Sequence, residues 1–135
     1  MAKASGPKTI FCYHCGHRLE VSFRTKSTPC PGCYKSLLVE DIVVKSYRGV
    51  INLETCGKLI VRKKGHAVAQ NRIVAQEGIE LDGRLRCIEA LTGGEVWLSK
   101  RSEWKGDLKA GTLVVEEGAV IREGRFLVEG REREV

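Results

Sequence analysis

The strongest constraint on this chain is a short unit that recurs five times after Arg48, a glycine followed by apolar or small residues at alternate positions. The units begin at Gly49, Gly65, Gly83, Gly106 and Gly124, and their residue numbers differ by 16, 18, 23 and 18. A period of about 17 residues is too short for a repeat of two helices and too long for one strand with a tight turn. It fits one coil of a β-solenoid that has three short strands and three corners. We therefore expect an all-β solenoid of about five coils.

A second apolar unit precedes the later glycines and supports the same period. It begins at Ile73, Val96 and Leu113, whose residue numbers are lower than those of Gly83, Gly106 and Gly124 by 10, 10 and 11. The longest interval contains residues 91–95, which we interpret as a loop or an enlarged corner. Alternating charged residues are expected to form outward ladders between coils, as at Glu80, Asp82, Arg84 and Arg86. The alternative architecture is an antiparallel sandwich or barrel, which also uses short strands and glycine turns.

Four cysteines in the first third of the chain have the spacing of a metal site. Cys12 and Cys15 form one Cys-x2-Cys pair, Cys30 and Cys33 form another, and the segment 16–29 separates the pairs. Four thiolates at this spacing can converge on one tetrahedral cation, and Zn²⁺ is the cation that this ligand set favours. Four protein ligands leave no open position for water, so the expected zinc ion is structural rather than catalytic.

We expect residues 1–48 to form a zinc ribbon with a basic N-terminal tail, and residues 49–135 to form the β-helix. Leu19–Phe23 alternates apolar and polar residues as a half-buried strand does, and Leu37–Val39 followed by Ile42–Val44 indicates a second extended segment. Two cysteine turns that bracket this hairpin would complete the ribbon. His14 and His17 can also ligate zinc, but with four cysteines present we expect them to lie outside the ligand set. A module this small cannot bury enough apolar surface to fold unaided, so the metal would hold it together.

Positive charge is concentrated in residues 1–48, which carry eight Lys and Arg against three Asp and Glu, whereas residues 49–135 carry 15 against 14. A basic module can bind nucleic acid, because Lys and Arg displace counterions from phosphates. Four aromatic residues lie near the ribbon cations and could stack on bases, namely Tyr13, Phe23, Tyr34 and Tyr47. The alternatives are that the charges only keep the module soluble and that the aromatics pack its small core.

The remaining cysteines and the chain start bear on the cellular compartment. Cys56 and Cys87 lie in apolar, strand-like segments without a nearby histidine or helix start to activate a thiol, so we expect small core residues rather than nucleophiles or disulfides. The start of the chain, 1–8, lacks the apolar stretch of a secretory signal, and apolar runs such as 113–115 are far too short to span a bilayer. These features predict a cytoplasmic protein without a transmembrane segment.

Two stretches near the end of the sequence, VWLSKRSEWKGDLKA at 96–110 and LVVEEGAVIREGRF at 113–126, resemble the closing coils of bactofilins, the bacterial polymer-forming cytoskeletal proteins. The resemblance covers roughly residues 49–129. It implies a right-handed parallel β-helix with three faces, nucleotide-independent filament formation through end-to-end contact, and a scaffolding role rather than catalysis. Bactofilins usually carry flexible tails, often with a short apolar membrane-targeting segment at the N-terminus, where this chain has the zinc ribbon.

The ends of a β-solenoid expose unpaired backbone groups and apolar side chains, so uncapped ends invite stacking. At the C-terminal end, Phe126, Leu127 and Val128 precede a short charged segment, 129–135, and we expect these three apolar residues to mediate self-association. At the N-terminal end the ribbon can act as a cap. One adhesive end would then remain, which predicts a dimer rather than a filament.

Three functional classes are compatible with this sequence. The first is a non-enzymatic scaffold that self-associates through the ends of the β-helix, with the ribbon as a cap or a protein-binding module. The second is a nucleic-acid-binding zinc ribbon carried on an inert solenoid. The third, an enzyme of the hexapeptide-repeat type, is disfavoured because the strict six-residue repeat is missing and His66 is the only histidine outside the ribbon.

Overall fold

The computed structural model describes residues 7–128, and within this range it contains strands and no helix, hence no helix able to cross a membrane. Four strands form the N-terminal module: β1 (Pro7–Phe11), β2 (Arg18–Ser22), β3 (Ser27–Pro29) and β4 (Ser36–Leu38). The others form a shaft: β5 (Ile42–Val44), β6 (Tyr47–Thr55), β7 (Lys58–Val61), β8 (His66–Ala75), β9 (Gly78–Leu81), β10 (Arg84–Leu91), β11 (Glu95–Leu98), β12 (Glu103–Ala110), β13 (Thr112–Val115), β14 (Val120–Glu123) and β15 (Phe126–Val128).

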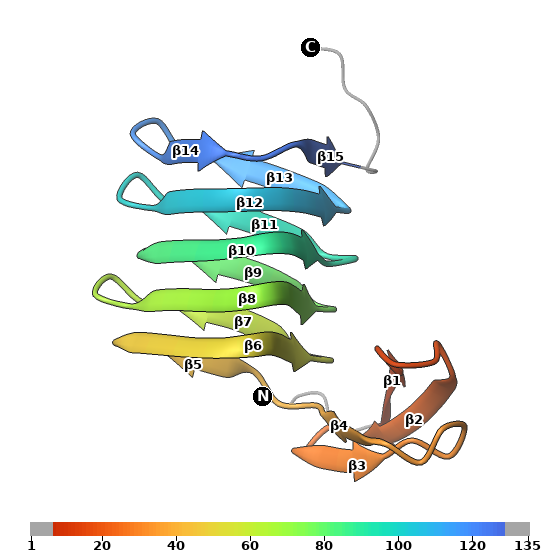
Figure 1. Ribbon diagram of the computed structural model, residues 1–135. Coiled ribbons are helices and arrows are strands. Elements are labelled where there is room, and N and C mark those ends of the chain that lie inside the picture. Colours follow the sequence, from red (N-terminus) through yellow and green to blue (C-terminus); the bar gives the residue numbers. More distant parts are fainter. Residues whose placement is uncertain (1–6, 129–135) are drawn as a thin grey trace.

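The shaft consists of two parallel sheets in which each coil of the chain stacks on the one before (Figure 1). The short strands form one sheet in the order β13-β11-β9-β7-β5, and the long strands form the other in the order β14-β12-β10-β8-β6, with β15 also paired to β12. Every strand pair in these two sheets is parallel. The alternative of an antiparallel sandwich or barrel is therefore wrong.

Each long strand bends in its middle and so supplies two of the three faces of the shaft. The register between neighbouring strands shifts at this bend, between Val50 and Asn52 in β6 and between Arg86 and Glu89 in β10. In the last coil the bend is a break, because β14 and β15 are separate strands that both pair with β12. The long strands run from left to right across the front of Figure 1 while the chain climbs from β5 to β13, so the coil is right-handed. The predicted right-handed β-helix of about five coils is confirmed.

Apolar side chains at alternate positions point into the shaft and form columns that run through all coils. One column of the short-strand sheet contains Ile42, Leu59, Ile79, Val96 and Leu113, whose residue numbers differ by 17, 20, 17 and 17. A second contains Val44, Val61, Leu81, Leu98 and Val115. In the three inner coils the members of both columns are at most 1% exposed. The differences agree with the period predicted from the glycines.

The glycines take several different positions in the coil, so the five units are not equivalent. Gly65 and Gly83 lie side by side at the corner before the long strands, where a Cβ on Gly83 would collide with the Gly65 carbonyl oxygen. Gly106 and Gly124 lie side by side at the bend instead, and Gly49 lies inside β6. The long interval between Gly83 and Gly106 arises from this change of corner. Residues 92–94 connect β10 to β11, at the place where we predicted a loop or an enlarged corner, and this corner is longer than the equivalent corners at 56–57 and 76–77.

Outward-facing side chains of neighbouring coils form ion pairs and hydrogen bonds with one another, as the alternation of charge predicts. Glu80 accepts from Lys58 of the preceding coil at 2.9 Å, and Arg84 lies 3.3 Å from Glu103 of the following coil. Asp82 accepts a hydrogen bond from the Ser99 hydroxyl at 2.6 Å. Pairs of this kind link residues about one coil apart in sequence, so they favour the observed register over a shifted one.

The N-terminal module contains two hairpins rather than the single hairpin that we expected. β1 pairs antiparallel with β2, and β3 pairs antiparallel with β4. Each cysteine turn therefore connects the two strands of a hairpin instead of bracketing one. The assignment of Ile42–Val44 to the ribbon is wrong, because this segment is β5 and pairs with β7 in the shaft. The solenoid sheets thus begin before Gly49.

Candidate metal centre and the two ends of the β-helix

Two turns bring the four predicted cysteine ligands together. Cys12 and Cys15 follow β1, and Cys30 and Cys33 follow β3. All four Sγ atoms lie within 4.8 Å of one another. The Sγ–Sγ distance is 3.7 Å both for Cys12 and Cys33 and for Cys15 and Cys30. All four are free thiols, so the cluster is a candidate metal centre rather than a pair of disulfides.

The cluster has the dimensions of a tetrahedral thiolate site. A metal ion with metal–sulfur bonds of about 2.3 Å holds its sulfurs about 3.8 Å apart, the edge of the corresponding tetrahedron. Two of the six Sγ–Sγ separations, at 3.7 Å, match this edge, and all six are at most 4.8 Å. The backbone N–H groups of His14 and Cys15 donate to Cys12 Sγ at 3.2 and 3.3 Å, and that of Gly32 donates to Cys30 Sγ at 3.2 Å. The residues present therefore fit a closed, four-cysteine metal site.

The electrostatics of the thiols also favour a bound cation. Burial disfavours ionisation of Cys12, but N–H bonds from Cys15 and His14 outweigh it and lower the Cys12 pKa to about 7. A backbone hydrogen bond from His17 favours the Cys15 thiolate, yet burial and the neighbouring sulfurs raise its pKa to about 12. Ionisation of one thiol thus opposes ionisation of the next, and a cation among the four sulfurs would remove this conflict.

The two ribbon histidines lie outside the cluster, as predicted. His14 and His17 are both exposed, and neither belongs to the group of side chains that could hold a metal. His17 lies against Gly32, where an added Cβ would be 3.0 Å from the His17 Cβ. This close approach explains why a glycine occupies the second cysteine turn at this position.

The ribbon aromatics differ in their availability for stacking. Tyr13 is half-buried in the small core of the module, and its hydroxyl accepts a hydrogen bond from the Leu38 N–H at 2.8 Å. Phe23 is 42% exposed with the Arg24 guanidinium 5.4 Å from its ring centroid, and Tyr34 is 84% exposed. Tyr13 is thus a packing residue, which was one of the two alternatives for the aromatics.

The ribbon is joined to the shaft by hydrogen bonds to the end of β1. The Gln76 side chain bonds both backbone groups of Phe11: its Oε1 accepts from the Phe11 N–H at 3.3 Å, and its Nε2 donates to the Phe11 carbonyl. Arg72 donates to the Tyr13 carbonyl at 3.3 Å. Both side chains come from the second coil, so the ribbon is tied to one defined place on the shaft.

The two cysteines outside the cluster are buried, as predicted. Cys56 is 1% exposed and packs with Ile10 and Leu37 in the core of the ribbon, where burial raises its pKa to about 11. Cys87 is 8% exposed in the shaft core, and burial raises its pKa to about 12. Thiols with such pKa values stay protonated at neutral pH, so neither is an activated nucleophile.

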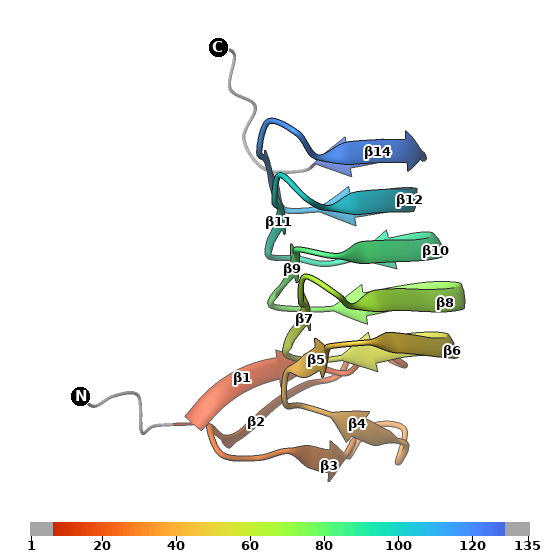
Figure 2. The same cartoon turned by 90° about the vertical axis from the view of Figure 1, so that its left-hand side faces the viewer.

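The ribbon lies against the N-terminal end of the shaft. Figure 2 shows β3 and β4 beneath β5 and β6, and Leu38 of β4 packs against the shaft core. Ile42, Val44 and Leu53 of the first coil are accordingly only 6%, 3% and 4% exposed. One inward position of this coil is exposed, and it carries Arg48, which aligns with the fully buried Ala67 of the next coil. The N-terminal end is thus covered in part and charged in part.

The C-terminal end has the opposite character. Val115, Ile121 and Val128 are 46%, 43% and 40% exposed, although they align with Leu98, Trp104 and Ala110 of the preceding coil, which are 0%, 0% and 1% exposed. These three side chains point toward the core of the shaft, but no further coil of residues 7–128 covers them. In the same range β13, β14 and β15 pair with the preceding coil alone, so one edge of each carries unpaired backbone groups.

The three residues predicted to mediate self-association do not share one orientation. Phe126 and Val128 align with inward residues of β12, whereas Leu127 aligns with the outward Lys109. Phe126 also packs edge-on against Trp104, with ring centroids 5.7 Å apart. The predicted charged segment after Val128 lies outside the described residues, as does the basic tail at 1–6.

The end residues of the other two faces, Val115 and Ile121, were not predicted from the sequence. The signal was present, because each follows a buried counterpart, Leu98 or Trp104, by one full period. Position near the end of the sequence identifies only 126–128, of which Phe126 and Val128 align with inward residues of β12. The end of a solenoid is formed by all three faces of its last coil. In this chain those faces are β13, β14 and β15, so the end includes residues that precede the last strand.

Comparison of the chain with protein-family models, with curated proteins and with solved structures gives no match. The functional conclusion therefore rests on the geometry of the metal centre and of the two ends.

Proposed function

We propose that this protein is a non-enzymatic scaffold that self-associates through the C-terminal end of its β-helix, with a structural zinc ion in the four-cysteine site of the ribbon. The observation that carries the proposal is the exposure of inward apolar residues in the last coil. Val115, Ile121 and Val128 occupy positions that are at most 1% exposed one coil earlier. Burial of such side chains against a second molecule would remove apolar surface from water, which favours association.

The backbone of the last coil supports the same proposal. The outer edges of β13, β14 and β15 present N–H and C=O groups that pair with no strand of residues 7–128. A second copy that stacks on this end can satisfy these groups while it covers the apolar side chains. Both contributions act at the same surface, so the end of the shaft is a better association site than its charged sides.

The difference between the two ends limits the assembly. The ribbon covers the apolar residues of the first coil, and Arg48 places a charge at the inward position that stays exposed. Burying an unpaired arginine in a stacked interface is costly, so this end should resist stacking. With one adhesive end per molecule, we propose a two-fold dimer in which the C-terminal ends meet. The resemblance to bactofilins supports the scaffolding role, and the ribbon departs from it by blocking growth at the other end.

Zinc is the metal that we assign to the cluster, because four cysteine sulfurs within 4.8 Å of one another, two pairs of them 3.7 Å apart, suit its preferred ligands and geometry. The ion would hold the two hairpins together and thereby keep the cap in place. We also place the protein in the cytoplasm, where thiols such as Cys56 and Cys87 stay reduced.

The test uses two neighbouring valines of β13. Val115→Lys places a charge on the end of the shaft, whereas Val114→Lys places the same charge on its side, since Val114 aligns with the outward Trp97. The two residues are 46% and 39% exposed, so the substitutions perturb folding to a similar degree. In sedimentation velocity, V115K should be monomeric at concentrations where V114K and the wild type are dimeric. Equal sedimentation of both variants and the wild type would refute the proposed interface.

A further inference from the structure

Cations that are dispersed along the sequence gather on one side of the shaft. This basic face consists of the corners before the long strands and the outward residues in the first halves of those strands, in the segments 45–49, 62–68, 82–86, 99–105 and 116–123. Without the inward Arg48, these segments contain ten Lys and Arg against five Asp and Glu. The remaining segments of residues 50–128 contain four Lys and Arg against six Asp and Glu. The two parts of the shaft surface therefore differ in the sign of their net charge.

Three of the five acidic residues on the basic face accept hydrogen bonds from residues of the same face, and one of them is Glu116, whose Oε1 accepts from the Lys100 N–H at 3.2 Å. The Asp82 carboxylate accepts from the Ser99 hydroxyl at 2.6 Å. Glu103 lies between Arg84, at 3.3 Å, and Arg122, whose Nε donates to it at 2.8 Å. The other cations of the face form no ion pair with a carboxylate of residues 7–128: Lys45, Arg62, Lys63, Lys64, Arg86, Lys100, Arg101 and Lys105. They are available to an anionic partner.

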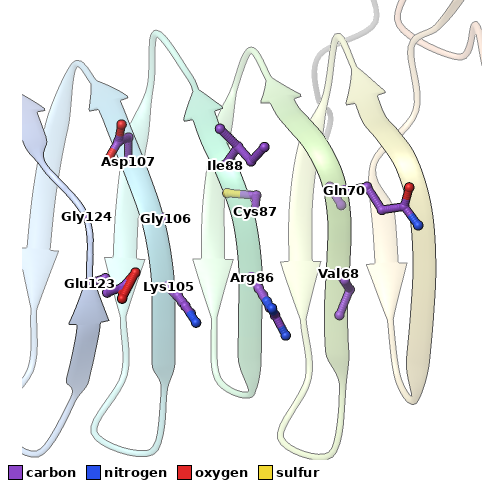
Figure 3. Close-up of a pocket in the computed structure, with 11 residues that line it drawn as sticks. Val68, Gln70, Arg86, Cys87, Ile88, Lys105, Gly106, Asp107, Glu123 and Gly124 are labelled. Atoms are coloured by element: carbon purple, nitrogen blue, oxygen red, sulfur yellow. The ribbon is translucent and has the colours of Figure 1, made fainter.

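The register of the long strands places Arg86 of β10 beside Lys105 of β12, with Val68 of β8 before them and Glu123 of β14 after them (Figure 3). These four residues lie beside a hollow at the bend, which Asp107 also lines. Gly106 and Gly124 line this hollow, and their φ angles of 139° and 133° are open to glycine alone among ordinary residues. Neither glycine has a side chain, so a bound strand could approach the backbone closely at these two positions.

An exposed aromatic ring lies at the N-terminal end of the same face. Tyr47 is 66% exposed, and the edge of its ring contacts His66 with centroids 5.5 Å apart. The ring lies across Gly49, where an added Cβ would be 2.6 Å from the Tyr47 hydroxyl oxygen. Tyr47 is thus supported on one side and open on the other, as a base-stacking residue is.

We infer that the basic face binds single-stranded nucleic acid. Lys and Arg side chains that form no ion pair can bind a phosphate backbone, and the tyrosine offers a surface on which one base can stack. A membrane fits the face less well, because interfacial binding adds buried apolar side chains to the cations. The exposed large apolar residues of these segments are Tyr47 at one end and Val120 and Ile121 at the other. This inference moves the expected nucleic-acid surface from the ribbon to the shaft, and it goes beyond the proposed scaffold function.

Fluorescence anisotropy with a labelled single strand of about 20 nucleotides, longer than the roughly 4–16 nucleotides that one small domain covers, tests the inference. The full chain is titrated at about 50 to 200 mM salt. The shaft variant Arg62→Ala/Lys63→Ala/Lys64→Ala should bind about tenfold more weakly at intermediate salt. Its slope of log affinity against log salt should fall by about 2, since each phosphate contact on a single strand contributes roughly 0.7.

A ribbon variant with the same change of charge, Arg18→Ala/Arg24→Ala/Lys35→Ala, is the matched control and should bind as the wild type does. Tyr47→Ala should weaken binding without a change of the salt slope, and Tyr47→Phe should restore it. Four results would overturn the inference: no binding at low salt, loss in the ribbon variant alone, equal affinity for the corresponding duplex, or binding to vesicles of anionic lipid but not to the single strand.

Discussion

Arg48 and Ile121 occupy the two ends of one inward column of the β-helix. Between them the column contains Ala67, Leu85 and Trp104, which are at most 2% exposed. The column therefore begins with a charge and ends with an apolar side chain that is 43% exposed. This polarity distinguishes an end that resists stacking from an end that invites it.

Removal of the N-terminal cap should convert the proposed dimer into longer assemblies. A chain that starts after Glu40 and carries Arg48→Leu exposes Ile42, Val44 and Leu53 at an end without the inward charge of Arg48, so both ends can then stack. Negative-stain electron microscopy should show filaments or sedimentation should show species larger than a dimer. The same truncation with Val115→Lys keeps one adhesive end and should stop at the dimer. A truncated chain that never exceeds the dimer would contradict the role of the ribbon as a cap.

The four-cysteine cluster should bind one zinc ion per chain. Cys30→Ser removes a buried ligand, so the zinc content should fall to near zero and the ribbon should lose structure, since a structural zinc site contributes on the order of 10 kcal/mol. Elemental analysis of purified protein measures the metal. The control is Cys87→Ser, which changes a buried thiol of the shaft and should leave the zinc content unchanged. Stoichiometric zinc in C30S would show that the cluster is not the site.

Glu103 should make stability depend on acid pH. Its hydrogen bond from Arg122, together with the nearby Arg84 charge, lowers its pKa in the folded state despite partial burial. A carboxyl with a lowered folded-state pKa stabilises the fold above its unfolded-state pKa, and this stabilisation disappears as the pH falls through the folded-state value. Urea unfolding should therefore show Glu103→Gln less stable than the wild type at pH 7, with the difference vanishing in acid. A constant deficit of E103Q across the range would rule out the ionic origin.

The two tryptophans should differ sharply in their contributions to stability. Trp104 is fully buried, its Nε1 donates to the Gly106 carbonyl at 2.7 Å, and its ring contacts Phe126. Trp104→Ala should reduce the free energy of unfolding by about 3–5 kcal/mol, as removal of a large core side chain does. Trp97 is 37% exposed on the outward side of β11, and Trp97→Ala should reduce it by less than about 1 kcal/mol. Chemical denaturation measures both values, and similar losses would contradict the inward and outward assignment.

The period of the solenoid could be read from the sequence, but the alignment of its coils could not. Glycine is favoured at every sharp corner, so Gly65 and Gly106 look alike in sequence although they lie at different corners. The apolar columns fix the true alignment, because a shift by one residue would turn buried side chains outward. Alignment of the alternating apolar residues, rather than of the glycines, would have placed Val115 and Ile121 at the end of the shaft.

The ligands of the metal centre could be predicted because each cysteine pair is a local turn whose geometry depends on a few residues. The partners of the neighbouring strands could not. Ile42–Val44 has the alternating burial of any half-buried strand, and its pairing with β7 rather than with a ribbon strand depends on contacts distant in sequence. The basic face was missed for a related reason, since a count of charge along the chain averages over faces that the coil separates.

Assembly through one end alone is tested most directly by the mass of the full chain in solution, measured by light scattering across a wide range of concentration. The covered N-terminal end and the open C-terminal end predict a mass that rises to that of two chains and then stays constant. A monomer at high micromolar concentration, or a mass that keeps growing with concentration, would show that the two ends do not differ in this way.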